Sequence, residues 1–139
     1  MRSAFIAYLD ASGTDHDQPV LAVAGFVALA EQWVEFEPPW KRRLEKDGLE
    51  FFHMSEVNRK FKGRSDERKQ LLQDLAQIVE FHVGVKVGCC VVNEGVAQIP
   101  ESDRRRWHMN AYSLAGRSCA AQIRLWGKSW GAPPLAYGF

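Results

Sequence analysis

Cysteine is scarce in this chain, which contains only Cys89, Cys90 and Cys119. An odd number that includes an adjacent pair does not build a disulfide framework, and no Cys-x-x-Cys spacing is present for a zinc site. Cys89 and Cys90 lie within an apolar run, so at least one of them is expected to be a small core residue. Both features favour a reducing compartment.

Long hydrophobic runs are also missing. The apolar segment near the N-terminus is about six residues long, too short for a signal-peptide core or a membrane span. We therefore expect a cytoplasmic protein with no membrane partner. The sequence also lacks repeats, linkers and the GxGxxG, P-loop, GxSxG and HExxH signatures, so no common catalytic motif names a reaction.

Neither sign of charge dominates, because 18 Lys and Arg residues face 17 Asp and Glu residues, for a net charge of +1. Bulk charge thus predicts neither a nucleic-acid partner nor an acidic ligand, and any such partner must be recognised by a local patch. The 139 residues, 46% hydrophobic and 25% charged, are typical of one globular domain.

Hydrophobic patterning predicts several strands. The apolar runs 4–9 and Val20–Leu29, separated by a polar loop, favour an antiparallel pair whose first strand is buried. The run 83–92 is apolar nearly throughout, as in a central strand covered on both faces. Residues 49–54 could form a short strand, and residues 135–139 resemble the start of a last one.

Helical periodicity occurs in three segments. Pro38 and Pro39 must interrupt the first, so we expect a short turn and then a helix from near Pro38 to Gly48. Ser65 starts a second, amphipathic helix that carries Leu71 and Leu75. Residues 103–130 predict one long helix.

The predicted order is β-β-α-β-α-β-α-β, a mixed α/β fold. A strand that ends at Phe139 has no following helix to cover its sheet, so we expect a chain truncated at the C-terminus. A short C-terminal edge strand is the alternative. An open sheet edge would favour a homo-oligomer.

The strongest local motif is Asp10 followed by Ser12 and Gly13. A carboxylate at the end of a buried strand is held rigidly and suits a hard divalent cation such as Mg²⁺ or Mn²⁺. The Ser-Gly turn brings backbone donors close to a bound group. The alternative is a turn aspartate that caps its own loop.

A second motif combines His53 and Glu56 after an aromatic segment. His53 could ligate a metal or transfer protons near neutral pH, and Glu56 would face the same way if a helical turn begins there. Alternatively, His53 is a hydrogen-bonded residue at a strand end and Ser55 caps a short helix.

A third motif lies on the expected helix 103–130. One narrow sector of this helix carries Arg106, Asn110, Ser113, Arg117, Arg124 and Lys128. Such a stripe can lie along a phosphate backbone, for which Arg117 and Arg124 are the candidate contacts, or it can be a solvated face. The adjoining sector, expected to face the core, carries Trp107, Ala111, Leu114, Ser118 and Leu125.

The segment Tyr8-Leu9-Asp10-Ala11-Ser12-Gly13, the helix with Trp40 and Leu44, and Phe52-His53-Met54 together resemble a prokaryotic family known as domain of unknown function 3800. The resemblance implies a ribonuclease H-like mixed sheet with flanking helices and metal-dependent nuclease activity. Family members usually have glutamate where this chain has Ala11, and they continue to later acidic residues.

Two hypotheses follow. In the first, residues 1–139 are an incomplete ribonuclease H-like domain for phosphodiester hydrolysis, with catalytic candidates Asp10, His53 and Glu56. Asp10 holds Mg²⁺ or Mn²⁺, and Ser12, Gly13, Arg117 and Arg124 contact the substrate. In the second, the chain is a non-catalytic truncated or degenerate module that binds a protein or a nucleic acid.

Overall fold

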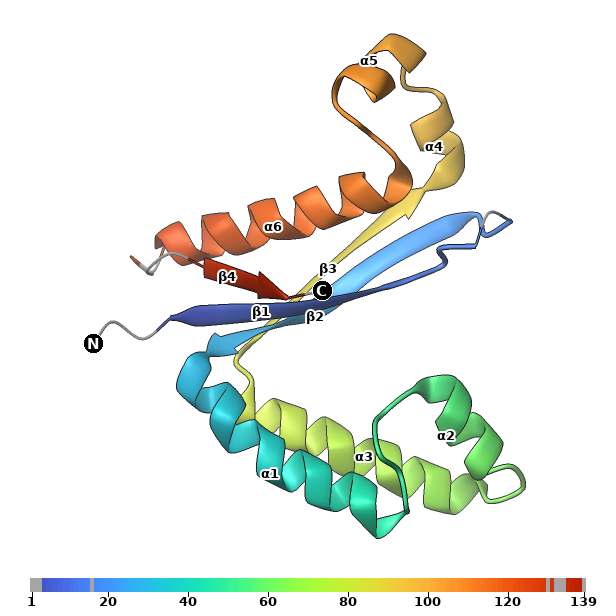
Figure 1. Ribbon diagram of the computed structural model, residues 1–139, viewed down its shortest axis with the longest axis vertical. Helices are drawn as coiled ribbons and strands as arrows, with labels where there is room; N and C mark the ends of the chain where they lie inside the picture. Colours follow the sequence, from blue (N-terminus) through green and yellow to red (C-terminus); the bar gives the residue numbers. More distant parts are fainter. Residues whose placement is uncertain (1–3, 16, 130, 132–134, 139) are drawn as a thin grey trace. The chain divides into compact units, whose positions relative to one another are not determined.

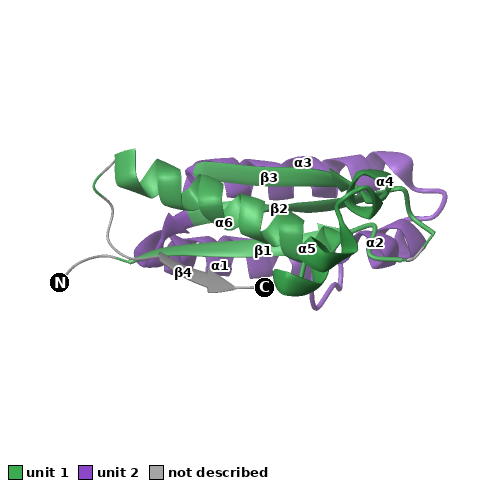
Figure 2. Ribbon diagram, turned by 90° about the horizontal axis from the view of Figure 1, so that it is seen from above, with its two compact units in different colours: residues 1–27, 85–139 green, residues 28–84 purple. Residues whose placement is uncertain are grey.

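The structure, a computed structural model, describes residues 4–15, 17–129, 131 and 135–138, the last range for its backbone only. Residues 1–27 and 85–139 form unit 1, and residues 28–84 form unit 2 (Figure 2). The chain thus contains two compact units, a division that leaves the prediction of a single domain untested.

The described elements follow one another as in Figure 1. Their bounds are β1 Phe5–Ser12, β2 Val20–Leu29, α1 Ala30–Lys46, α2 Met54–Lys60, α3 Ser65–His82, β3 Val85–Val92, α4 Asn93–Ala97, α5 Glu101–Arg106, α6 Ala111–Ser129 and β4 Leu135–Gly138. The fold is therefore mixed α/β, as the sequence patterning predicted.

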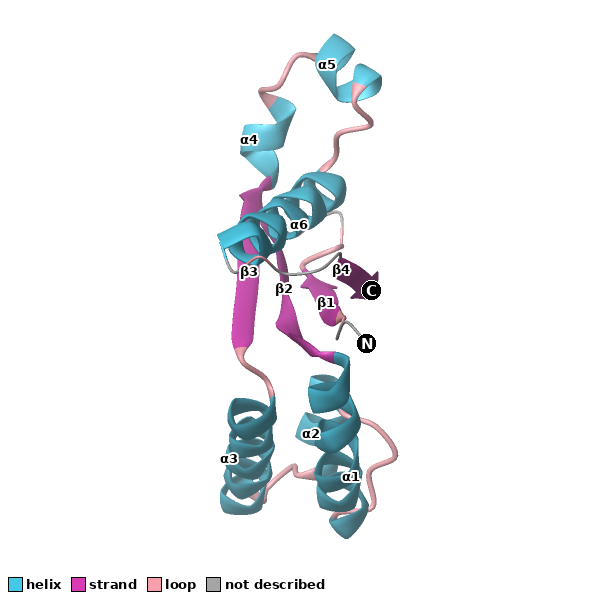
Figure 3. Cartoon of the chain, turned by 90° about the vertical axis from the view of Figure 1, so that its left-hand side faces the viewer, coloured by secondary structure: helices cyan, strands magenta, loops and turns pink. Residues whose placement is uncertain are grey.

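Unit 1 contains a sheet with the strand order β3-β2-β1-β4 (Figures 1 and 3). Strands β2 and β3 are antiparallel, with Val20 opposite Val92. Strand β4 is parallel to β1, with Phe5 opposite Leu135. The prediction that the first two strands and the 83–92 segment share one sheet is confirmed.

Two glycines bring β1 and β2 close together. A Cβ on Gly25 would lie 1.9 Å from the carbonyl oxygen of Tyr8, and one on Gly13 would lie 2.1 Å from that of Val20. The backbone at Gly13 also has a φ of +75°, a region that favours glycine. Because later positions of β1 meet earlier positions of β2, the two strands run antiparallel.

The hydrophobic core of unit 1 lies between one face of this sheet and α6 (Figure 3). Alternate side chains of each strand enter it, as the period of a β-strand requires. Its buried members are Ala7, Leu9, Leu21, Val23, Val27, Val91, Ala115, Cys119 and Ile123. Burial raises the pKa of the Cys119 thiol, which contacts the Val23 carbonyl oxygen at 3.6 Å.

Two expectations about the strands are wrong in detail. Strand β1 is buried on one face only, and Tyr8 on the other face is 51% exposed. Strand β3 lies at an edge of the described sheet, and its residues alternate between partly buried and exposed. Apolar residues such as Val92, which is 54% exposed, made the run look covered on both faces.

Unit 2 consists of α1, α2 and α3 around its own core (Figure 1). The buried members are Leu44, Leu49, Val57, Phe61, Leu71 and Leu75. An ion-pair network crosses from α1 to α3, because Arg43 Nε donates to Asp74 Oδ2 at 2.7 Å and Arg43 Nη1 donates to Asp47 Oδ2 at 2.6 Å. The helix predicted to start at Ser65 is confirmed.

Two predictions for unit 2 are wrong. Helix α1 runs through Pro38 and Pro39 without interruption, since its aromatic stripe packs within the unit on both sides of the prolines. Ring centroids of Phe36 and Trp40 lie 5.0 Å apart. Residues 49–54 form no described strand; Leu49 is buried in the helical core and His53 precedes α2.

The predicted long helix 103–130 is two helices. Helix α5 ends at Arg106, and His108 has a φ of 48°, which a right-handed helix cannot contain. The expected core sector is wrong in part: Trp107 precedes α6 and is 53% exposed, and Leu125 is 68% exposed although it lies on α6, whereas Ala111 and Leu114 pack on the core.

Among the described residues, no helix is both long and apolar enough to span a membrane.

Candidate functional site

Asp10 lies near the end of β1 on the sheet face opposite α6. Its neighbours Leu9 and Ala11 point toward the core beneath α6, so the alternation of the strand places Asp10 on the other face, where it is exposed. The carboxylate oxygen Oδ1 accepts a hydrogen bond of 2.8 Å from the backbone N–H of Ala11. Among the described residues, no donor is bonded to Oδ2, which leaves it open to a ligand.

The described pairing of β1 with β4 does not reach Asp10. The described pairing of the two strands ends with Tyr8 opposite Gly138, and Asp10 lies beyond it along β1. Ser12 is exposed and has the same strand parity as Asp10, so both side chains belong to one face. Gly13 then turns the chain toward β2.

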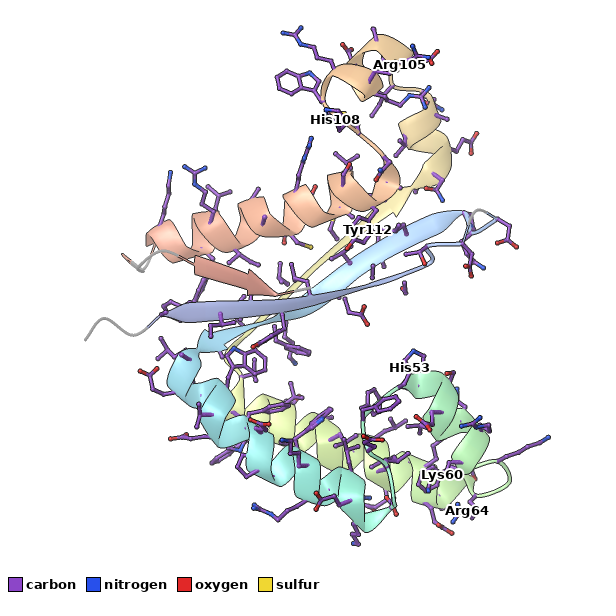
Figure 4. All side chains as sticks on the ribbon, in the orientation of Figure 1. His53, Lys60, Arg64, Arg105, His108 and Tyr112 are labelled. Carbon is purple, nitrogen blue, oxygen red and sulfur yellow. The ribbon has the colours of Figure 1, made fainter. Side chains whose placement is uncertain are left out.

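His53 and Glu56 lie together at the start of α2 in unit 2 (Figure 4 labels His53). The His53 carbonyl oxygen accepts the first helical N–H groups, including that of Val57 at 3.0 Å, and its ring Nδ1 lies 2.7 Å from Ser55 Oγ. A shallow hollow is lined here by Phe51, His53, Ser55, Glu56 and Arg59. The alternative of a hydrogen-bonded histidine agrees with this contact, but His53 follows no described strand and is itself the N-cap of α2, the role expected of Ser55.

The carboxylate of Glu56 is already engaged. Arg59 Nη2 lies 3.5 Å from its Oε1, one turn along α2. Because Asp10 belongs to unit 1 while His53 and Glu56 belong to unit 2, the geometry of neither unit tests whether the three share a cation. That arrangement stays a prediction.

Only part of the predicted basic stripe lies on α6. Arg117, Arg124 and Lys128 lie on the exposed face of α6 and line a shallow hollow with Ala120, Ala121 and Leu125. Arg106 and Asn110 precede α6 and are not members of its face. Since α6 separates this face from the sheet, the structure does not bring Arg117 and Arg124 to Asp10 (Figure 3).

Side chains that could ligate a metal ion are not grouped together in the described part of the chain. Among the described residues, no group of three or more His, Cys, Asp and Glu side chains is arranged to hold a metal ion. A two-metal site holds its ions about 3.5–4 Å apart and needs several ligand side chains around them, so the described donors do not fit it by themselves.

Sequence reasoning missed a cluster around Trp107. This side chain was assigned to the core, yet it is exposed, and the Arg106 guanidinium lies 5.2 Å from its ring centroid. The sequence contained a signal for this arrangement. Asn110 is a residue type preferred at the start of a helix, so a new helix can begin there and leave Trp107 in the preceding connection.

Comparisons with protein-family models, curated proteins and solved structures found no match to this chain. The resemblance to domain of unknown function 3800 is therefore untested by them.

Proposed function

We propose that this chain is a ribonuclease H-like domain that binds the phosphate backbone of a nucleic acid along α6. The observation that carries this proposal is the exposed face formed by Arg117, Arg124 and Lys128. Helix α6 contains no Asp or Glu, so no carboxylate of its own neutralises these three charges. Exposed cations without neighbouring acids attract phosphates and release their counterions.

The spacing along α6 suits a chain of phosphates. Arg117 and Lys128 are separated by about 16 Å, at about 1.5 Å of rise per residue. A stacked strand carries a phosphate every 3.4 Å or so, and several therefore fit within this length. Ala120 and Ala121 between the cations leave room for the backbone to approach the helix.

The order of the sheet agrees with the ribonuclease H-like part of the proposal. A meander of antiparallel strands β1, β2 and β3 is followed by a helical crossover, which brings β4 beside β1 in parallel. Unit 2 is inserted between β2 and β3. This arrangement supports the proposed fold and places Asp10 on an interior strand of the sheet.

The test is the affinity for a fluorescein-labelled oligonucleotide, measured by anisotropy. The double variant Arg117→Gln/Arg124→Gln should bind about tenfold more weakly, for single strands of any sequence. The matched control Arg42→Gln/Lys69→Gln removes two exposed charges from unit 2 and should bind as the wild type does. Equal losses in the two double variants would show that α6 has no special role.

A second candidate function is divalent-cation-dependent phosphodiester hydrolysis centred on Asp10. The specific observation in its favour is the open Oδ2 atom on an exposed sheet face. In this proposal Mg²⁺ or Mn²⁺ binds Asp10, and His53 and Glu56 are candidate ligands or proton-transfer groups. A hydrolytic centre of this kind would require carboxylates in addition to the described donor set.

A further inference from the structure

The last turn of α5 and the connection to α6, residues 104–110, form a defined turn that we name the elbow. The Met109 N–H donates to the Arg104 carbonyl oxygen at 2.8 Å, and the Trp107 N–H donates to that of Asp103 at 3.0 Å. His108 has a φ of 48° and is the one described non-glycine residue with positive φ. Such a conformation persists only where surrounding bonds impose it.

Helix α6 supplies those bonds. The Ser113 N–H donates to Asn110 Oδ1 at 2.8 Å, and the Asn110 N–H donates to Ser113 Oγ at 3.0 Å. The Ser113 hydroxyl is also 3.0 Å from the His108 carbonyl oxygen. The elbow is therefore fixed to the first turn of α6 and presents its side chains in a set direction (Figure 4 labels Arg105 and His108).

The exposed side chain that this turn presents is Trp107, 53% exposed, with the Arg106 guanidinium over its ring. The other two arginines of the elbow have partners: Arg104 Nε donates to the Ile99 carbonyl oxygen, and Arg105 pairs with Glu101. Arg106 has no described carboxylate partner, so its charge is available.

From this geometry we propose that the elbow is a stacking platform for one base of a single-stranded nucleic acid, with Arg106 contacting an adjacent phosphate. An aromatic face accepts any base, and a nearby guanidinium adds both stacking and charge. The inference rests on the proposed function, because it extends a strand bound along α6.

The placement of the elbow supports one continuous path. Helix α4 follows β3 at the end of the strand, and α5 lies beyond α6 on the side away from the sheet in both Figure 1 and Figure 3. The outer face of α6, which carries Arg117, thus leads toward the elbow at the N-terminal end of the helix. The acidic residues of α5 are Glu101, already paired, and Asp103.

The partner is single-stranded because stacking requires a free base face. In a duplex both faces of each base are covered by neighbours, so Trp107 could contact only a terminal pair. Single strands expose these faces, and proteins that bind them without sequence preference combine aromatic platforms with a basic groove. The phosphate contacts along α6 would bind single and double strands alike.

The experiment compares a fluorescein-labelled oligothymidylate with the matched duplex. Trp107→Ala should weaken the single strand by about 5-fold to 100-fold and leave the duplex unchanged. Trp107→Phe should restore most of the affinity, because the aromatic face is kept. The control Phe81→Ala removes an aromatic side chain that is 85% exposed in unit 2 and should have no effect. Circular dichroism checks that each variant is folded.

The outcomes separate the two proposals. If Trp107→Ala binds the single strand as the wild type does, or loses as much affinity for the duplex as for the single strand, the stacking role of the elbow is overturned. The α6 proposal stands in that case if Arg117→Gln/Arg124→Gln still binds more weakly than the wild type. Failure of the wild-type chain to bind either nucleic acid overturns both.

Discussion

At the scale of single residues, Asp10 decides between a binding module and a hydrolase. Its Oδ1 atom accepts the Ala11 N–H, and no donor among the residues that the structure describes is bonded to its Oδ2 atom on the exposed face. One carboxylate oxygen with few neighbouring donors binds a divalent cation weakly. The position is thus suited to a cation that further ligands complete.

Isothermal titration with Mn²⁺ tests this role. We expect binding of about millimolar strength or weaker, lost in Asp10→Ala, because no group of three or more His, Cys, Asp and Glu side chains among the described residues is arranged to hold a metal ion. The control Asp15→Ala removes an exposed loop carboxylate and should bind as the wild type does. Undiminished binding in Asp10→Ala would remove this residue from the site.

The absence of a side chain at Gly25 allows β1 and β2 to approach each other closely. A methyl group at this position would lie 1.9 Å from the Tyr8 carbonyl oxygen and 2.7 Å from Leu9 Cδ2. Gly25→Ala should therefore lower the free energy of unfolding by more than about 2 kcal/mol, measured by urea denaturation.

Gly88→Ala is the matched control on β3. The nearest atom to its added Cβ is 3.7 Å away, an ordinary contact, so the free energy of unfolding should change by less than about 1 kcal/mol. Equal effects of the two substitutions would contradict the close packing of β1 on β2.

At the scale of elements, the contact of α1 with α3 includes the network of Arg43, Asp47 and Asp74. Hydrogen bonds from Arg43 and Gln70 hold the pKa of Asp74 below its usual range. The folded protein therefore keeps this carboxylate charged at a pH where the unfolded chain protonates it. Its contribution to stability is present above the unfolded pKa of about 3.9 and is lost as the pH falls through the lower folded value.

Asp74→Asn should consequently be destabilised by about 1–2 kcal/mol at neutral pH, and by less near pH 3. Urea denaturation at both pH values measures the difference. Glu35→Gln, an exposed charge change on α1, should show little effect at either pH. A difference for Asp74→Asn that is constant with pH would contradict this account of the network.

The elements that sequence could predict are those with one uninterrupted period. Helix α3 and the strands β1, β2 and β3 follow from their apolar patterns. The path of α1 through Pro38 and Pro39 could not be predicted, because tertiary packing of its aromatic stripe overrides the loss of two donors. The break before α6 depends on a left-handed His108, a conformation that its residue type does not specify.

At the scale of the whole molecule, the near-neutral composition conceals an uneven distribution of charge. The net charge is +1, yet α6 carries three cations, all on its exposed face, and no acid. Sequence periodicity found this face because Arg117, Arg124 and Lys128 share a true helix. The prediction included Arg106 wrongly, because the helix was expected to begin near Asp103 and Arg106 in fact ends α5.

The candidate site was predicted in parts and not as a whole. The position of Asp10 near a strand end follows from a local pattern, whereas His53 was expected at a strand end and instead precedes α2. The insertion of unit 2 between β2 and β3 does not follow from a local pattern, since the residues 28–84 have no compositional boundary that marks a separate core. Whether these groups lie close together in space depends on tertiary structure, which local sequence patterns do not specify.

The central claim is that the α6 cations contact phosphates, and the salt dependence of oligothymidylate affinity tests it most directly. Each phosphate contact on a single strand contributes about −0.7 to the slope of log K against log salt. Arg117→Gln/Arg124→Gln should therefore reduce the magnitude of the slope by about 1.4 relative to the wild type. The same slope in both proteins would contradict the claim, whatever the difference in their affinities.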